Sequence, residues 1–163
     1  MSAVSKESGL GRSSLYHYFP GGKEEMALAA LDAATRVIEG PVNKALFATG
    51  APQERLRAML ALLRTYYEDG TLGCLIGALA TADCPAAVRL KVGALARNWI
   101  GSVADFLAEA KQLEPEAAAA RLIATLQGSL VVAGATGDEM YFHAALAEID
   151  DRFGLKSLAP NLT

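Results

Sequence analysis

The sequence predicts an all-α fold, and three observations lead to that prediction. Alanine and leucine dominate the apolar residues, as is typical of helices. No segment alternates apolar and polar residues at the period of two that a half-buried strand shows. Glycine and proline divide the 163 residues into segments of helical periodicity. With 52% hydrophobic and 20% charged residues, the chain has enough apolar material for a buried core.

Three helices are predicted in residues 1–40. Two short helices span about 2–8 and 12–18, and they end at a glycine and before Pro20. The third starts near Lys23 and is expected to end at about residue 39, where Gly40-Pro41 follows. We treat residues 1–40 as one small domain and residues 41–163 as a second, larger one.

Five further helices are predicted in the larger domain, and no internal repeat occurs. Proline stands near the start of two of them, where its missing N–H costs no hydrogen bond. The apolar residues of the first helix form two stripes, which indicates a helix between two neighbours. The expected ranges are 52–69, 74–82, 86–112, 115–136 and 139–153.

Charge and cysteine content limit the class of protein. The formal net charge is −3, yet residues 1–23 carry +2 and the remainder −5, which would suit a small anion-binding end. Cys74 and Cys84 form no CxxC pair, so we expect reduced thiols and neither a metal nor another cofactor. The polar N-terminus and the lack of a long uncharged run predict a cytoplasmic protein that does not cross a membrane.

The stretch SSLYHYFPGGKEEM places four ring-bearing side chains in a row on a short helix. Successive helical residues point about 100° apart, so the four cannot all be buried in one core. Leu15, Tyr18 and Phe19 share one face, which predicts that they point inward. The opposite face collects Arg12, Ser13, Tyr16 and His17.

A face of that composition suits DNA. Arginine and serine donate hydrogen bonds to base edges or phosphates, and tyrosine and histidine bond phosphate oxygens and stack on sugars. The tight Gly9-Leu10-Gly11 connection before it fits a helix-turn-helix. Lys23, beside the free N–H groups at the start of the third helix, adds a possible anion site. The alternative is that Tyr16, His17 and Lys23 are ordinary solvated surface residues.

The segment SGLGRSSLYHYFPGGKEEM resembles the end of the DNA-binding domain of the TetR family of bacterial transcriptional regulators. The doubled glycine, and the later GCLIGALA, Trp99 and LQGSLVVA, resemble its LmrA/YxaF-like subgroup, so that the resemblance covers essentially the whole chain. It implies a homodimeric, ligand-responsive regulator, a repressor by expectation, that binds a palindromic double-stranded DNA operator. Carried over by position, the recognition helix would supply Arg12, Ser13, Ser14, Tyr16 and His17, and Lys23 would contact a phosphate.

One departure from the family pattern supports a different class of function. Family members have a whole helix before the first one here, which holds the recognition helix from beneath, and this sequence begins at Met1 without it. The alternative is therefore a truncated helical small-molecule sensor or dimerisation protein that does not bind DNA. An enzyme is poorly supported, because Cys74 has no evident base nearby and His143 pairs only with Glu139.

The larger domain would hold a small, largely apolar effector if the resemblance applies. Aromatic and methionine residues at helical spacing are the candidates, although such residues also pack simply as core. Tyrosine hydroxyls, the indole N–H and Asn98 would be the polar groups. The predicted lining residues are Met59, Leu63, Tyr66, Tyr67, Trp99, Val103 and Phe106.

The helix of residues 116–136 is apolar nearly all round, which predicts cover from its own core on one side and from a second chain on the other. Together with residues 139–153 it resembles the four-helix dimer interface of the family. Burial inside one monomer is the alternative. The predicted interface residues are Leu122, Leu126, Leu130, Phe142 and Leu146.

Overall fold

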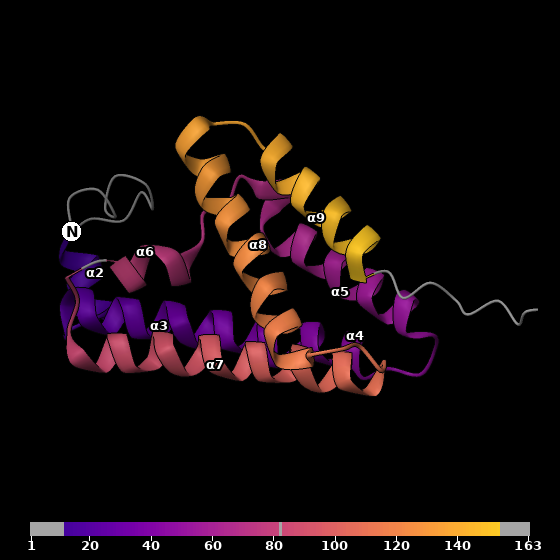
Figure 1. Ribbon diagram of the computed structural model, residues 1–163. Coiled ribbons are helices and arrows are strands. Elements are labelled where there is room, and N and C mark those ends of the chain that lie inside the picture. The colour runs from indigo at the N-terminus through magenta and orange to yellow at the C-terminus, as the bar shows by residue number, and fades with distance from the viewer. Residues whose placement is uncertain (1–11, 82, 154–163) are drawn as a thin grey trace, which may run out of the picture.

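The computed structural model describes residues 12–81 and 83–153, and within them it confirms the all-α prediction (Figure 1). The first helix predicted, 2–8, lies outside the described residues. Most boundaries fall within three residues of those expected. The elements are α2 (Arg12–Tyr18), α3 (Gly22–Val37), η1 (Ile38–Val42), α4 (Asn43–Leu46), α5 (Pro52–Tyr66), η2 (Glu68–Gly70), α6 (Leu75–Thr81), α7 (Ala86–Glu109), α8 (Pro115–Thr136) and α9 (Met140–Phe153).

The core lies where α8 packs against α7 on one side and α9 on the other, with α5 beside α9 (Figure 1). Trp99, Phe106 and Phe142 are fully buried there. Aromatic side chains of this size remove large apolar areas from water, so they dominate the stability of a small helical domain. The apolar periodicity of α7 and α9 thus faces one common core.

The segment after α3 differs from the prediction. The helix was expected to end at Gly40-Pro41, but the chain continues through the π-helical turn η1 into α4. Pro41 lacks an N–H and Gly40 departs from helical geometry with φ −87° and ψ −107°, so the backbone kinks there. Ile38, Val42 and Leu46 are nonetheless buried, and this burial holds the kinked helix on the core.

Three polar contacts fix α3, η1 and α4 along α7. Lys91 donates to Asp32, the Asn98 side chain donates to Glu39 over 3.2 Å, and the Asn43 side chain donates to Ser102 over 3.0 Å. In each pair the residues are 59 positions apart, so the helices run in the same direction in constant register. These contacts join the segment that follows α2 to α7.

By length and composition, α8 is apolar enough to cross a membrane. Leu122, Leu126 and Leu130 are each at most 1% exposed, and they belong to the core that α8 forms with its neighbours. A helix that packs in the core accounts for this composition, and one such helix is weak evidence for a membrane span.

Candidate DNA-binding surface and ligand cavity

The exposed side of α2 carries the predicted phenol and imidazole. Tyr16 is 51% exposed and His17 is exposed, whereas Leu15 is buried. Tyr18 was expected to point inward, and this prediction is wrong, because its ring is 67% exposed. It occupies the last position of α2, where its ring contacts the His17 ring edge-on at 5.7 Å. Ser14 and Phe19 are half-buried.

Two of the predicted contact residues have side chains outside the described part of the chain. Arg12 and Ser13 form the first turn of α2, but their side chains lie outside the described part of the chain. The Gly9-Leu10-Gly11 connection lies outside it as well. The predicted helix-turn-helix pair therefore stays a prediction, and the structure describes its second helix.

A tight turn brings α2 next to the start of α3. The Gly22 N–H donates to the Phe19 carbonyl over 2.8 Å, and Gly22 has a φ of +69°. That conformation favours glycine, which explains the second glycine of the PGG sequence. A methyl group at Gly22 would lie 3.9 Å from the Tyr16 ring, so Tyr16 stands directly beside the first turn of α3.

Lys23 is exposed at the second residue of α3, near Tyr16 across the turn. The Glu25 carboxylate accepts the Gly21 N–H over 2.8 Å and so satisfies one free donor at the helix start. The negative charges of Glu24 and Glu25 also complement the positive end of the helix dipole. Lys23 therefore supplies positive charge at the start of α3 through its ammonium group. It does not complete an anion site of free N–H groups, because Glu25 already accepts one of them.

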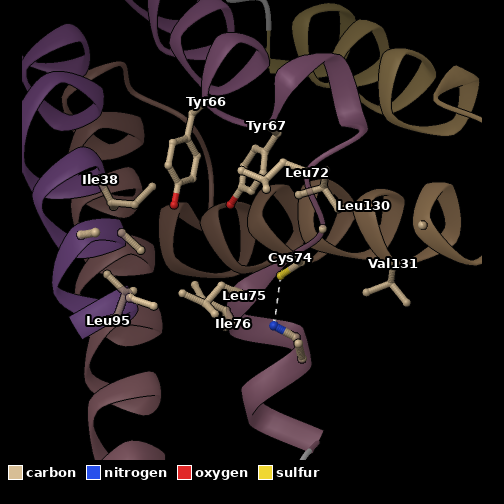
Figure 2. A pocket seen from close by; sticks show the side chains of 17 residues that line it. Ile38, Tyr66, Tyr67, Leu72, Cys74, Leu75, Ile76, Leu95, Leu130 and Val131 are labelled. Atoms are coloured by element: carbon tan, nitrogen blue, oxygen red, sulfur yellow. Dashed lines mark hydrogen bonds between the residues drawn. The ribbon is translucent and has the colours of Figure 1, made fainter. Parts of the chain in front are cut away.

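A cavity of about 760 Å³ opens between α3, α6 and α8, below the end of α5 (Figure 2). This volume is in the range of sites for drug-sized molecules. Alanine and glycine residues of α3, α6 and α8 form part of the wall, and their small side chains leave space that the neighbouring Leu75, Ile76 and Leu95 do not fill. The lining residues are Ala30, Ala33, Ala34, Ile38, Tyr66, Tyr67, Leu72, Gly73, Cys74, Leu75, Ile76, Gly77, Ala78, Leu95, Leu130, Val131 and Gly134.

The polar groups of the wall lie at the end of α5 and just before α6. The Gln127 amide joins two of them, since its Nε2 donates to the Tyr67 hydroxyl over 3.2 Å and its Oε1 accepts the Cys74 thiol proton. The Gly77 N–H donates to Cys74 Sγ over 3.0 Å. The Tyr66 and Tyr67 rings meet edge-on, with their centroids 4.9 Å apart. Neither Gln127 nor Cys74 was predicted as a site residue, because neither shares a stripe with the aromatic residues.

Burial keeps these groups protonated. It raises the pKa of the Tyr67 hydroxyl far above its ordinary value, although the Gln127 hydrogen bond opposes this. Burial also raises the pKa of Tyr66 and of the Cys74 thiol. The tyrosine hydroxyls are therefore neutral hydrogen-bonding groups at physiological pH, and Cys74 is a weak nucleophile.

Two of the seven predicted lining residues, Tyr66 and Tyr67, line this cavity. The other five do not, because large neighbours fill the space around them and each is completely buried. The Trp99 N–H is buried and has no partner among the described residues. Asn98 bonds Glu39 on the surface. The five core residues are Met59, Leu63, Trp99, Val103 and Phe106.

The predicted dimer residues face inward. Four of them are at most 1% exposed within one chain, and Leu146 is half-buried against the same core. The apolar periodicity of α8 and α9 thus marks the side of each helix that faces the core of its own chain, and not a side that faces a second chain. The four buried residues are Leu122, Leu126, Leu130 and Phe142.

The outer side of α8 and α9 is nonetheless apolar. Val131 and Val132 on α8 are 55% and 41% exposed, and Val131 also lines the cavity. Met140 and Tyr141 on α9 are 61% and 42% exposed. Gly128 lies on the same side of α8 as Val131, and a side chain built there would meet nothing within 4 Å. This outer side, defined by these five residues, is the α8–α9 outer face.

The all-helical fold, with an exposed short helix packed against the start of a longer one, fits the class of HTH-type transcriptional regulators, and comparison with known proteins supports that class. The chain is similar to the uncharacterized HTH-type transcriptional regulator YxaF of Bacillus subtilis (strain 168), 27% identical over 82% of this chain and 71% of that protein. It is also 32% identical to the HTH-type transcriptional regulator LmrA of the same organism, over 49% of this chain and 44% of LmrA. No protein-family model matches the sequence. No solved structure matches it significantly.

Proposed function

We propose that this protein is a DNA-binding transcriptional regulator whose affinity for DNA responds to a small molecule. The similarity to YxaF over 82% of the chain carries the proposal, because both relatives are HTH-type transcriptional regulators by name. The exposed Tyr16 and His17 beside Lys23 support it, since phenol, imidazole and ammonium groups all bind DNA phosphates.

In this proposal α2 is the recognition helix. Arg12, Ser13, Ser14, Tyr16 and His17 would contact the major groove or its edges, and Lys23 would contact a phosphate. Tyr16 and Lys23 lie on either side of the α2–α3 turn, so one stretch of DNA backbone can meet both. The operator would be a double-stranded palindrome.

The cavity is the proposed effector site. α3 supplies Ala30, Ala33 and Ala34 to its wall and carries Lys23 at its start, so one helix links the cavity to the DNA-binding end. A ligand that fits the cavity better in one position of α3 than in another shifts the population toward that position. We propose that this shift weakens DNA binding, as in a repressor released by its effector.

We also propose that two chains pair through the α8–α9 outer face. Exposed apolar side chains on adjacent helices are typical of an interaction surface, and a two-fold dimer would present two recognition helices to a palindrome. Gly128→Arg should convert the dimer to a monomer in light scattering, because the new side chain projects from that face. Gly101→Arg is the matched control, since Gly101 on α7 also has no neighbour within 4 Å of a built side chain. A monomeric wild-type protein would contradict the dimer.

The test of DNA binding is a fluorescence-anisotropy titration with DNA from immediately upstream of the gene, at several salt concentrations. We expect saturable binding that prefers this DNA over a scrambled sequence and weakens steeply with salt as counterions are released. Equal, weak binding to both sequences would contradict the regulator. Ligand binding without DNA binding would then favour the alternative, a small-molecule sensor, since no described residue of α2 lines the cavity.

A further inference from the structure

The residues that line the cavity indicate the charge and polarity of the molecules that it would bind. Of the described residues that line it, none carries a charged side chain. Transfer of an ionised ligand from water into such a wall costs far more than transfer of a neutral one. The apolar surface comes mainly from alanine, leucine and isoleucine side chains. The wall therefore favours an uncharged and largely apolar ligand.

The hydrogen bonds at the end of α5 run in one direction. Cys74 donates its thiol proton to Gln127, and Gln127 donates an amide proton to the Tyr67 oxygen. The Tyr67 oxygen thus acts as an acceptor toward the protein, and its own proton is left to donate elsewhere. The Gln127 side chain, which lies behind the cavity wall, therefore fixes the direction in which the Tyr67 hydroxyl donates its proton.

The Tyr66 hydroxyl stands beside that of Tyr67 and makes no hydrogen bond to any described residue. Figure 2 shows both tyrosine oxygens directed from α5 into the space above Leu75 and Ile76. Both hydroxyls stay protonated because burial raises the pKa of each tyrosine. The cavity thus presents two adjacent O–H donors that its own wall does not use.

We propose that the cavity binds an uncharged, largely apolar molecule through an acceptor oxygen, such as a ketone or amide carbonyl, which takes hydrogen bonds from Tyr66 and Tyr67. Tyr66 is the specificity-determining residue, because its hydroxyl has no other partner among the residues that the structure describes. Gln127 is a positioning residue that orients the Tyr67 proton toward the ligand. This assignment rests on the proposed function, since it names the class of molecule that would act as the effector.

The test uses 6-propionyl-2-(dimethylamino)naphthalene, a neutral aromatic ketone whose emission moves to longer wavelength when its carbonyl accepts a hydrogen bond. The full chain is titrated with this dye and, in parallel, with the analogue in which a propyl group replaces the propionyl group. We expect the ketone to bind more tightly than the alkyl analogue by roughly three- to tenfold, the usual contribution of one or two hydrogen bonds. An anionic naphthalene sulfonate should not compete for the cavity.

Tyr66→Phe should remove most of the preference for the ketone and move the emission of the bound dye to shorter wavelength, while binding of the alkyl analogue stays unchanged. Gln127→Met should produce a smaller shift in the same direction. Tyr18→Phe is the matched control, because the Tyr18 ring is 67% exposed on α2, of which no described residue lines the cavity. Unchanged emission and preference in Tyr66→Phe, or displacement of the ketone by the sulfonate, would overturn the assignment. These titrations contain no DNA, so a chain that binds the ketone in this way but no DNA would overturn the regulator and leave the cavity assignment intact.

Discussion

Two aromatic regions of the molecule, one around Trp99 and Phe106 and the other around Tyr66 and Tyr67, differ in what faces them. The first lies among leucine, valine and methionine side chains, and Arg55 lies over the Phe106 ring at 5.2 Å. The second borders a cavity whose wall combines alanine and glycine of α3, α6 and α8 with Leu75, Ile76 and Leu95, and these residues do not fill the space. One region is solid core and the other a cavity, although both show the same helical spacing of large residues.

Whether an aromatic side chain borders a cavity thus depends on the residues that face it as much as on the aromatic residue itself. A helix that carries alanines on one face leaves room wherever the opposite helix does not approach closely. Substitutions on the two sides should therefore have different consequences, for stability in the solid region and for ligand binding in the open one.

The largest expected effect is that of Trp99→Ala in the solid region. Removal of a fully buried indole leaves a void that rigid neighbours cannot close, so the free energy of unfolding should fall by about 3–5 kcal/mol. Urea unfolding followed by far-ultraviolet circular dichroism measures this. Tyr66→Ala, in the open region, should cost clearly less. Equal losses in the two variants would break the comparison.

A smaller loss is expected for Gly70→Ala, at the junction between α5 and α9. Gly70 has a φ of +103°, and a methyl group there would lie 2.9 Å from Phe142 Cβ. Strain and overlap together should lower the free energy of unfolding by about 1–3 kcal/mol. Gly101→Ala, in the middle of α7 with open space around it, should instead stabilise the protein by roughly 0.5–1 kcal/mol. Thermal unfolding of both variants would contradict this account if they shifted in the same direction.

Alkaline pH should weaken the folded state through the open region. Burial raises the pKa of Cys74 and Tyr67 above their ordinary values of 9.0 and 10.0, so both groups favour the folded state while protonated. Their contribution is fully present below those values and is lost as pH rises above them. Unfolding free energies measured from pH 8 to 11 should fall with pH, and less steeply in Tyr67→Phe. A slope that is the same in the variant would argue against a buried, protonated Tyr67.

The smallest expected effect on stability is that of Tyr66→Phe. The hydroxyl bonds no described residue, so its removal leaves no protein group without a partner. The free energy of unfolding should change by less than roughly 0.5 kcal/mol, as for most surface-like substitutions. Chemical unfolding measures this in the same preparation used for dye binding. A larger loss would show that the hydroxyl has a structural partner.

The helices were largely predictable from the sequence, because glycine and proline residues that end helices and the 3.6-residue apolar period are local signals. Residues 12–18 and 115–136 match α2 and α8 at both ends. The kinked passage through Gly40-Pro41 was not predictable in this way. Buried Val42 and Leu46 hold the chain helical there, and their burial depends on tertiary packing.

The candidate sites were predicted less well, for a physical reason. Periodicity identifies the apolar side of a helix but not the element that covers it, so Leu122 and Phe142 were assigned to a dimer instead of the core. It also selects large residues, whereas a cavity depends on small ones such as Ala33 and Gly77. Gln127 acts through its hydrogen bonds, and no spacing rule identifies such a residue.

The measurement that tests the central claim most directly is the DNA affinity of Tyr16→Ala and Lys23→Ala, determined by anisotropy with the upstream DNA across a salt series. We predict that each variant binds roughly three- to tenfold more weakly with unchanged stability, and that Lys23→Ala lowers the salt slope by about one. Phe47→Ala and Lys44→Ala, which change exposed residues outside α2, α3 and the α8–α9 outer face, should bind like the wild type. Wild-type affinity and salt slope in both test variants would contradict the assignment of α2 and the start of α3 as the DNA-binding end.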